Sequence, residues 1–318
     1  MEKKVNGRII KGIGGLYTVA LLDAELGTVA CRARGALRRE AAPLAGDRVL
    51  VSYDADRVAA KHDDADARFV IEEIVDRKNA LIRPPLANLD FLFVTVAAAS
   101  PAPVLLTIDK LISISVHNGI EPVVIITKCE LDRAYADELA EIYRKAGFRT
   151  IITSAETGEG VNILREYIEK LPEGSISAFS GASGVGKSTL LNSLFPSLRL
   201  STSSVSRKTE RGRHTTRQTE LFVIREGGEN GENPVFLADT PGFTMLDFEQ
   251  FDFFTIDDLP FTMRDFESYI GTCKYKKCSH TKEEGCSIIA AVEAGDISPS
   301  RHKSYLSLYE ILKTKKKW

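Results

Sequence analysis

The sequence predicts an α/β protein in three parts: a small β-barrel, a domain with a doubly wound parallel sheet, and a mostly helical C-terminal domain. Residues 1–76 are rich in short β-type runs, and residues 77–246 alternate apolar runs with helical patterns. Residues 247–318 hold a Cys/His cluster followed by two helical patterns. A chain of 318 residues is long enough for two or three domains, each with its own core.

The first part consists of short strand patterns separated by turns. Residues 7–21 predict a strand, a glycine turn and a second strand, and residues 27–35, 43–51 and 67–74 predict further strands. Several short strands close together are typical of a small closed barrel of the OB type. An SH3-like barrel would produce much the same pattern.

The second part alternates between two periodicities. Short apolar runs begin at Phe91, Pro122, Thr150 and Ile176. Helical patterns alternate with them at residues 106–118, 132–145, 161–170 and 187–195. This alternation predicts a parallel sheet that binds its ligand at the carboxyl ends of the strands. In the third part, residues 287–294 and 299–313 predict two helices.

The composition is that of an ordinary globular protein, with 43% apolar residues, 27% charged residues and a formal net charge of −2. No segment approaches the roughly 20 apolar residues of a membrane span, and the N-terminus lacks the apolar core of a secretory signal. We therefore expect a cytoplasmic protein that does not bind membranes. Basic residues gather in residues 201–220 and 271–318. Such patches can meet an RNA backbone, although a solvated surface would look the same.

The chemistry begins with a glycine-rich motif, Gly181-x-x-x-x-Gly186-Lys187-Ser188, between a predicted strand and a predicted helix. In this context the motif predicts a P-loop that holds a nucleoside triphosphate through backbone N–H groups. Lys187 should reach the β- and γ-phosphates, and the Ser188 hydroxyl should bind Mg²⁺.

Two further segments complete the expected phosphate site. Asp239-Thr-Pro-Gly242 follows a short apolar run, so Asp239 should hold Mg²⁺, directly or through its ligands, and the Gly242 N–H should face the γ-phosphate. Gly212-Arg-His-Thr-Thr216 predicts a switch loop in which Thr215 or Thr216 completes the Mg²⁺ coordination. A threonine-rich solvent loop is the alternative for this second segment.

Thr127-Lys-Cys-Glu130 ends one predicted strand and Thr153-Ser-Ala-Glu156 ends the next. They resemble the guanine-reading elements of GTPases, usually Asn-Lys-x-Asp and Ser-Ala-Lys. The predicted nucleotide contacts are therefore Thr127, Lys128, Glu130, Ser154, Ala155, Gly181, Ala182, Ser183, Gly184, Val185, Gly186, Lys187, Ser188, Thr189, Asp239 and Gly242.

A cluster of soft ligands, Cys273-x₄-Cys278-x-His280-x₅-Cys286, lies in the third part. Three thiolates and an imidazole suit a closed, tetrahedral structural Zn²⁺. Unrelated thiols in a loop would be the alternative.

The order of these motifs is informative. Ordinary small GTPases place the P-loop first, whereas here the guanine-reading pair precedes it, which indicates a circular permutation. With a barrel before it and the Cys/His cluster after it, the chain resembles the ribosome small-subunit-dependent, circularly permuted bacterial GTPases. The segments Gly212-Arg-His-Thr-Thr, Asp239-Thr-Pro-Gly-Phe and Ala291-Val-Glu-Ala-Gly-Asp-Ile-Ser make the resemblance specific.

The resemblance implies GTP hydrolysis stimulated by the small ribosomal subunit, a role in late maturation of that subunit, and contacts of the barrel and zinc domain with ribosomal RNA. No more than a monomer is required. Phe243 stands where many GTPases place a water-orienting glutamine, and the resemblance nominates His214 in its place, beside Lys187 and Thr215 as catalytic residues.

One departure concerns the base. Thr127 and Glu130 replace the usual Asn and Asp, which predicts weakened guanine discrimination because specificity comes from fully satisfied hydrogen bonds to the base edge. Two other functions compete with a GTPase: a P-loop ATPase or nucleotide kinase, and a nucleotide-regulated RNA-binding scaffold with negligible turnover.

Overall fold

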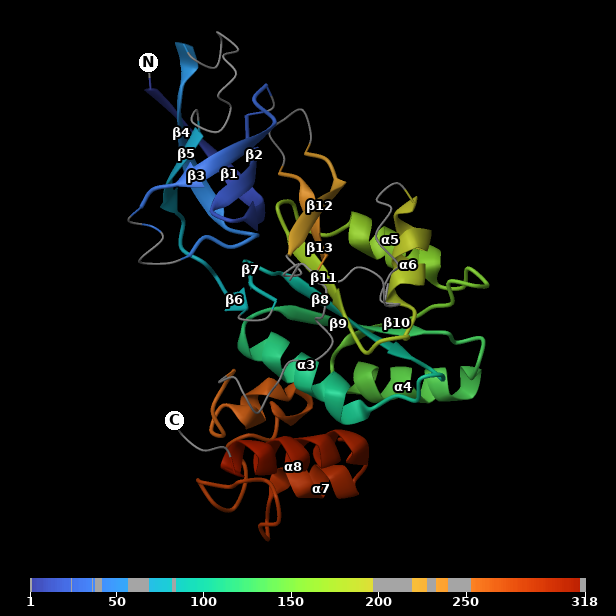
Figure 1. The fold of residues 1–318 in the computed structure, drawn as a ribbon. Helices are drawn as coiled ribbons and strands as arrows, with labels where there is room; N and C mark the ends of the chain where they lie inside the picture. Colours follow the sequence, from blue (N-terminus) through green and yellow to red (C-terminus); the bar gives the residue numbers. More distant parts are fainter. Residues whose placement is uncertain are drawn as a thin grey trace, which may run out of the picture. The chain divides into compact units, whose positions relative to one another are not determined.

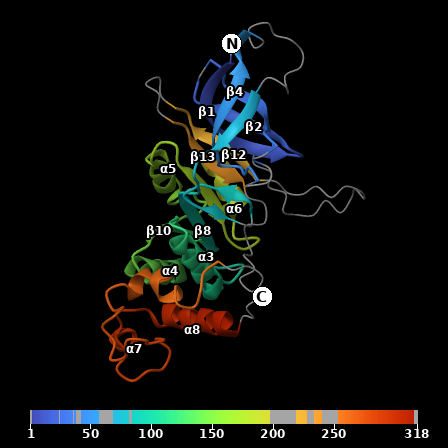
Figure 2. The same cartoon turned by 90° about the vertical axis from the view of Figure 1, so that its left-hand side faces the viewer.

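The computed structural model describes residues 2–23, 25–35, 37, 42–56, 69–81, 84–196, 219–227, 233–239 and 253–314. The chain divides into two compact units (Figures 1 and 2). The first comprises Met1–Asp90, Glu169–Phe179 and Val205–Phe243, and the second comprises Phe91–Ile168, Ser180–Ser204 and Thr244–Trp318.

The first unit contains the predicted barrel. Its strands pair in the closed order β1-β2-β3-β5-β4, which is that of an OB barrel. Antiparallel pairing of β1 with β4, in which Val5 lies opposite Val51, closes the barrel, and β3 pairs with β5 in parallel. The strands are β1 (Glu2–Ile13), β2 (Leu16–Leu21), β3 (Thr28–Ala33), β4 (Arg48–Asp54) and β5 (Phe69–Ile74).

Alternation along these strands places one face inside the barrel, because successive side chains of a strand point to opposite faces. Ile9, Val19, Cys31, Val51 and Ile71 are fully buried there and form a common apolar cluster. Burial raises the pKa of the Cys31 thiol to about 12, so this cysteine is a neutral core residue.

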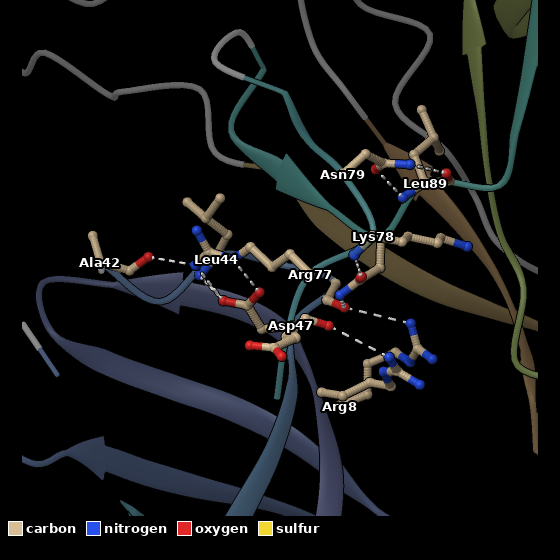
Figure 3. A network of polar contacts seen from close by, with 12 residues as sticks. Arg8, Ala42, Leu44, Asp47, Arg77, Lys78, Asn79 and Leu89 are labelled. Carbon is tan, nitrogen blue, oxygen red and sulfur yellow. Dashed lines mark hydrogen bonds and ion pairs between the residues drawn. The ribbon is translucent and has the colours of Figure 1, made fainter. Parts of the chain in front are cut away.

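The segment after the barrel is joined to it by a polar network (Figure 3). Asp47 is fully buried, and its two carboxylate oxygens accept hydrogen bonds from Arg77 Nε at 2.7 Å and Nη2 at 2.8 Å. The Leu44 N–H also donates to Asp47, and Arg77 Nη2 donates to the Ala42 carbonyl. The short hairpin of β6 (Ala80–Leu81) and β7 (Leu86–Ala87) follows.

Three more strands belong to the first unit. In it β11 (Ile176–Ser180) pairs in parallel with β13 (Val235–Asp239), which pairs antiparallel with β12 (Glu220–Arg225). Strand β12 was not predicted from the sequence. Its Leu221-Phe-Val-Ile run was the available signal, hidden by the polar, basic residues that precede it.

The second unit contains a parallel sheet in the order β10-β9-β8, with strands β8 (Phe91–Ala97), β9 (Glu121–Thr127) and β10 (Arg149–Ile152). The helices α3 and α4 lie on one face of these strands, and α5 and α6 lie on the other (Figures 1 and 2). All these elements agree with the predicted ranges to within one or two residues. The helices are α3 (Leu105–His117), α4 (Arg133–Lys145), α5 (Val161–Glu169) and α6 (Lys187–Leu194).

The C-terminal part of the second unit packs on α3. It comprises the short 3₁₀ turns Leu259–Thr262 and Arg264–Phe266, then α7 (Ser287–Glu293) and α8 (Pro299–Thr314), as predicted for both α-helices. Arg301 of α8 is fully buried and donates to Asp109 of α3 at 2.5 Å. It also makes a two-pronged ion pair with Asp265, with N–O distances of 2.8 and 3.1 Å.

Among the helices in the described ranges, none combines the length and the apolar character needed to cross a membrane.

The Asp47–Arg77 pair provides a test of the barrel. Asp47→Ala leaves the Arg77 guanidinium and the Leu44 N–H without their shared acceptor, so we expect a loss of about 3 kcal/mol in the free energy of unfolding. Denaturant unfolding of the full chain measures it. The control is Asp137→Ala, which removes an exposed i,i+4 pair with Arg133 and should cost less than about 0.5 kcal/mol. Equal losses in the two variants would contradict this account.

Candidate nucleotide and metal sites

The predicted P-loop lies between β11 and α6. Gly181 has a φ of +147°, and a Cβ atom there would stand 2.1 Å from the Thr95 carbonyl oxygen of β8. Only glycine fits so close an approach. The loop then opens α6 at Lys187, so backbone N–H groups at a helix N-terminus are available to an anion.

Lys187 turns back over this loop. Its ammonium donates to the carbonyl oxygens of Gly181 at 2.6 Å and Ala182 at 2.9 Å. Burial lowers the pKa of Lys187 from its usual 10.5 to about 8. An ammonium held by neutral carbonyls in a partly desolvated loop is poised to exchange them for phosphate oxygens. Ser188 follows as a half-buried residue in the first turn of α6.

The first base-reading segment is tied to the P-loop. The buried Thr127 hydroxyl, at the end of β9, lies 2.5 Å from the Val185 carbonyl oxygen and donates to it. Lys128 has a φ of +55°, and its ammonium donates to the Ser100 carbonyl at 2.6 Å. A Cβ atom on Gly186 would lie 3.7 Å from Lys128 Cε, so the lysine stem passes beside the loop. Glu130 is exposed.

The second base-reading segment lies next to the first. The Thr153 N–H donates to the Ile126 carbonyl at 2.6 Å, and the Cys129 N–H donates to the Thr153 carbonyl at 3.4 Å. Ser154 is buried, and its hydroxyl accepts the Thr157 N–H at 3.1 Å, which shapes the turn that presents Ala155. Backbone hydrogen bonds therefore join the two segments to each other, and the Thr127 hydroxyl joins the first of them to the P-loop.

The remaining predicted residues are placed less fully. Asp239 ends β13, where its backbone lies opposite Glu220 of β12. His214, Thr215, Thr216, Gly242 and Phe243 lie outside the residues that the structure describes.

The predicted metal ligands converge. One ligand atom from each of Cys273, Cys278, His280 and Cys286 lies within 4.8 Å of the other three. The Cys273 and Cys286 sulfurs are 3.9 Å apart, and His280 Nδ1 lies 3.6 and 3.5 Å from them. Zinc–sulfur bonds of about 2.3 Å in a tetrahedron place two sulfurs about 3.8 Å apart, so the cluster can hold one zinc ion.

The metal loop is held from outside the cluster. The Tyr305 hydroxyl of α8 donates to the Ser279 carbonyl at 2.8 Å. The Glu283 carboxylate accepts the N–H groups of Ser279 at 2.8 Å and Thr281 at 3.0 Å. The Ser287 N–H, at the start of α7, donates to the Cys273 sulfur at 3.4 Å. Such contacts orient metal ligands before an ion binds.

Comparisons with known proteins agree with this arrangement. The family model described as RsgA GTPase matches residues 74–249, and that of the RsgA N-terminal domain matches residues 6–60. The small ribosomal subunit biogenesis GTPase RsgA of Caldanaerobacter subterraneus subsp. tengcongensis is 37% identical over 317 residues, which are 99% of this chain and 98% of that protein. The protein of the same name from Geobacillus thermodenitrificans is 36% identical over 98% of each chain.

Two solved structures share the fold. YjeQ from Thermotoga maritima matches with a TM-score of 0.78 and 29% identity over 99% of this chain and 100% of that one. YloQ, described as a circularly permuted GTPase, matches with a TM-score of 0.73 and 29% identity over 99% and 98%. The predicted permuted GTPase fold, with an N-terminal barrel and a C-terminal Cys/His cluster, is confirmed.

The lowered pKa of Lys187 generates a pH prediction. Below pH 8 the free lysine is already charged, so affinity for GDP should not change with pH. Above pH 8 binding must first take up a proton, and the affinity should fall about tenfold between pH 7 and pH 9. Titration of a fluorescent GDP analogue measures it. Lys187→Arg, which does not titrate in this range, should be flat, and a flat wild-type profile would contradict the prediction.

Proposed function

Because the chain belongs to the RsgA GTPase family, we propose that it hydrolyses GTP on the small ribosomal subunit and acts in late maturation of that subunit. The relatives named above as small ribosomal subunit biogenesis GTPases support the ribosomal role. The P-loop supports the chemistry, because Lys187 lies over an anion-binding helix N-terminus. An ATPase and an RNA-binding scaffold with negligible turnover are the alternatives.

The proposed site has three parts. Lys187 and the P-loop amides bind the β- and γ-phosphates, and Ser188, Asp239 and Thr215 or Thr216 hold Mg²⁺, directly or through its ligands. When bound, Mg²⁺ would neutralise the negative charge that develops on the phosphates. Gly242 faces the γ-phosphate. The base is received by Lys128, Glu130, Ser154 and Ala155.

Thr127 takes a positioning role in this proposal. Its hydroxyl donates to the P-loop carbonyl of Val185, so it ties the base-reading segment to the phosphate-binding loop without an amide. Guanine discrimination then depends on Glu130, whose exposed carboxylate must reach the N1–H and N2–H₂ groups of the base. The longer glutamate supports the expectation of weakened discrimination.

For the attacking water we propose His214. The Phe243 side chain carries no hydrogen-bonding group, so we assign this role to the switch loop, residues 212–216. An imidazole can accept a proton from the attacking water or orient it, and such groups contribute about 10²–10⁴-fold to a rate.

The three parts of the chain divide the work in the proposal. Residues 1–76 and 247–318 contact ribosomal RNA and protein, and residues 77–246 bind and hydrolyse GTP. Cys273, Cys278, His280 and Cys286 hold a structural Zn²⁺ with no open position for chemistry. The protein acts as a cytoplasmic monomer and does not bind membranes.

GTP hydrolysis measured with and without purified small subunits tests the proposal. We expect phosphate release from GTP to rise with the subunits, and ATP to stay intact. His214→Ala should still bind GDP but lose about 10²-fold or more of the stimulated rate. His117→Ala, at the end of α3, serves as the matched control. Subunit binding without turnover would favour the scaffold, and ATP hydrolysis would favour the ATPase.

Metal analysis tests the zinc site separately. The full chain purified without chelators should carry one zinc ion, and Cys286→Ser should lose it because a closed site needs all four ligands. Cys129→Ser, a buried cysteine outside the cluster, should keep it. A wild-type protein that carries no zinc, or that carries it equally after Cys286→Ser, would remove the site from the proposal.

A further inference from the structure

A cavity of about 530 Å³ lies in the first unit, and none of its lining residues belongs to the P-loop or to the metal cluster. It is lined by residues of β1, β2 and β4, by the segment before β8, by the turn before β11 and by the start of β13. Small-molecule sites usually measure about 300–1,000 Å³ and hold a few convergent polar groups. The charged side chains here are those of Arg8, Arg48, Lys78, Asp90 and Glu173.

Arg8 is the central group of this cavity. Its guanidinium carbon lies 5.4 Å from the centre of the Phe236 ring, and Nη1 donates to the Gly46 carbonyl at 3.4 Å. Burial lowers the pKa of Arg8 to about 10, so the group stays charged at neutral pH. Within the described ranges, no carboxylate lies close enough to Arg8 to form an ion pair with it.

The carboxylates near Arg8 are already used. Asp47 accepts hydrogen bonds from two nitrogen atoms of Arg77. Figure 3 shows this pair and Arg8 together. Asp90 pairs with Lys78 through one oxygen and accepts the Ile176 N–H at 2.9 Å through the other. Most of the donor capacity of the Arg8 guanidinium is therefore left for something that enters the cavity.

Arg48 adds a second guanidinium. It is exposed, and it donates to the Asp76 carbonyl at a long 3.5 Å. Its charge lowers the pKa of Arg8, so the two cations repel each other, while the Asp90 and Asp47 carboxylates raise that pKa and offset part of the repulsion. The planar guanidinium of arginine can donate two parallel hydrogen bonds to phosphate oxygens. An anion bound between two guanidinium groups offsets their mutual repulsion.

The turn before β11 supplies a different chemistry. A Cβ atom on Gly174 would lie 3.9 Å from Arg8 Nη2 and 3.3 Å from Asn233 Cβ, so this turn passes next to the guanidinium. Glu173 and Asn233 line the same cavity and are exposed. A carboxylate accepts hydrogen bonds from hydroxyl groups, and an amide can accept or donate them, whereas the carboxylate would repel a bare polyanion.

We propose that this cavity binds a ribose phosphate, with the phosphate on Arg8 and Arg48 and the sugar hydroxyls at Glu173 and Asn233. The group has two sources, a free sugar phosphate and a nucleotide of an RNA strand. The lining of the cavity shares no residue with the P-loop.

Isothermal titration of the full chain, saturated with GDP so that the P-loop is filled, tests the proposal. The probes are ribose 5-phosphate, a tetrauridine oligonucleotide and inorganic phosphate. We expect ribose 5-phosphate to bind at least tenfold more tightly than inorganic phosphate. If only the oligonucleotide binds, and binds through Arg8, the source is RNA.

The variants separate this site from general charge effects. Arg8→Gln and, at the exposed rim, Arg48→Gln should each weaken binding at least tenfold, while Arg32→Gln, on an exposed position of β3 outside the cavity, should leave it unchanged. Unfolding midpoints of all three confirm that the chain is folded. The proposal is overturned if neither ribose probe binds, if inorganic phosphate binds equally well, or if Arg32→Gln has the same effect. These outcomes leave the GTPase proposal untouched.

Discussion

The close approach of the P-loop to the ends of two neighbouring strands is the constraint on which the nucleotide site depends. Gly181 lies against the Thr95 carbonyl of β8, and the Thr127 hydroxyl of β9 donates to the Val185 carbonyl. A side chain at position 181 would collide with the Thr95 carbonyl, and an apolar side chain at position 127 would lose the hydrogen bond to the loop. Because the contacts come from β8 and β9, the position of the phosphate cradle and that of the base-reading segment are set together.

This constraint explains how the motif order can be permuted without loss of the site. The base-reading residues precede the P-loop in the chain, yet the contacts between them are lateral, from one strand end to a neighbouring loop. Lateral contacts do not depend on which segment comes first. Permutation changes only what is covalently attached, and here the strand that ends at Asp239 is followed by the segment that leads to the metal-binding part.

Much of the architecture could be predicted because it is written in local patterns. The strands β8 to β11, the helices between them and the Cys/His cluster follow from periodicity, punctuation and ligand spacing. Long-range pairings are different. Nothing in the sequence around Arg301 distinguishes it from a surface residue of a helix, and its partners Asp109 and Asp265 lie 192 and 36 residues away. Likewise, the sequence shows Thr127 only as a replacement for the usual Asn, and its hydrogen bond to the Val185 carbonyl is visible only in the structure.

The cluster of Arg301, Asp109 and Asp265 also joins the metal-binding part to the GTPase core. Burial raises the pKa of Asp109, and Arg301 opposes that rise, so the charges are tolerated only while the three side chains remain together. A buried ion cluster contributes little net stability compared with apolar packing, yet breaking it by removal of one partner costs about 3–5 kcal/mol. The ion cluster therefore fixes how α8 aligns with α3 but adds little to the free energy of unfolding. Since α3 connects β8 to β9, the metal-binding part is attached to the helix that lies between the two strands that position the P-loop.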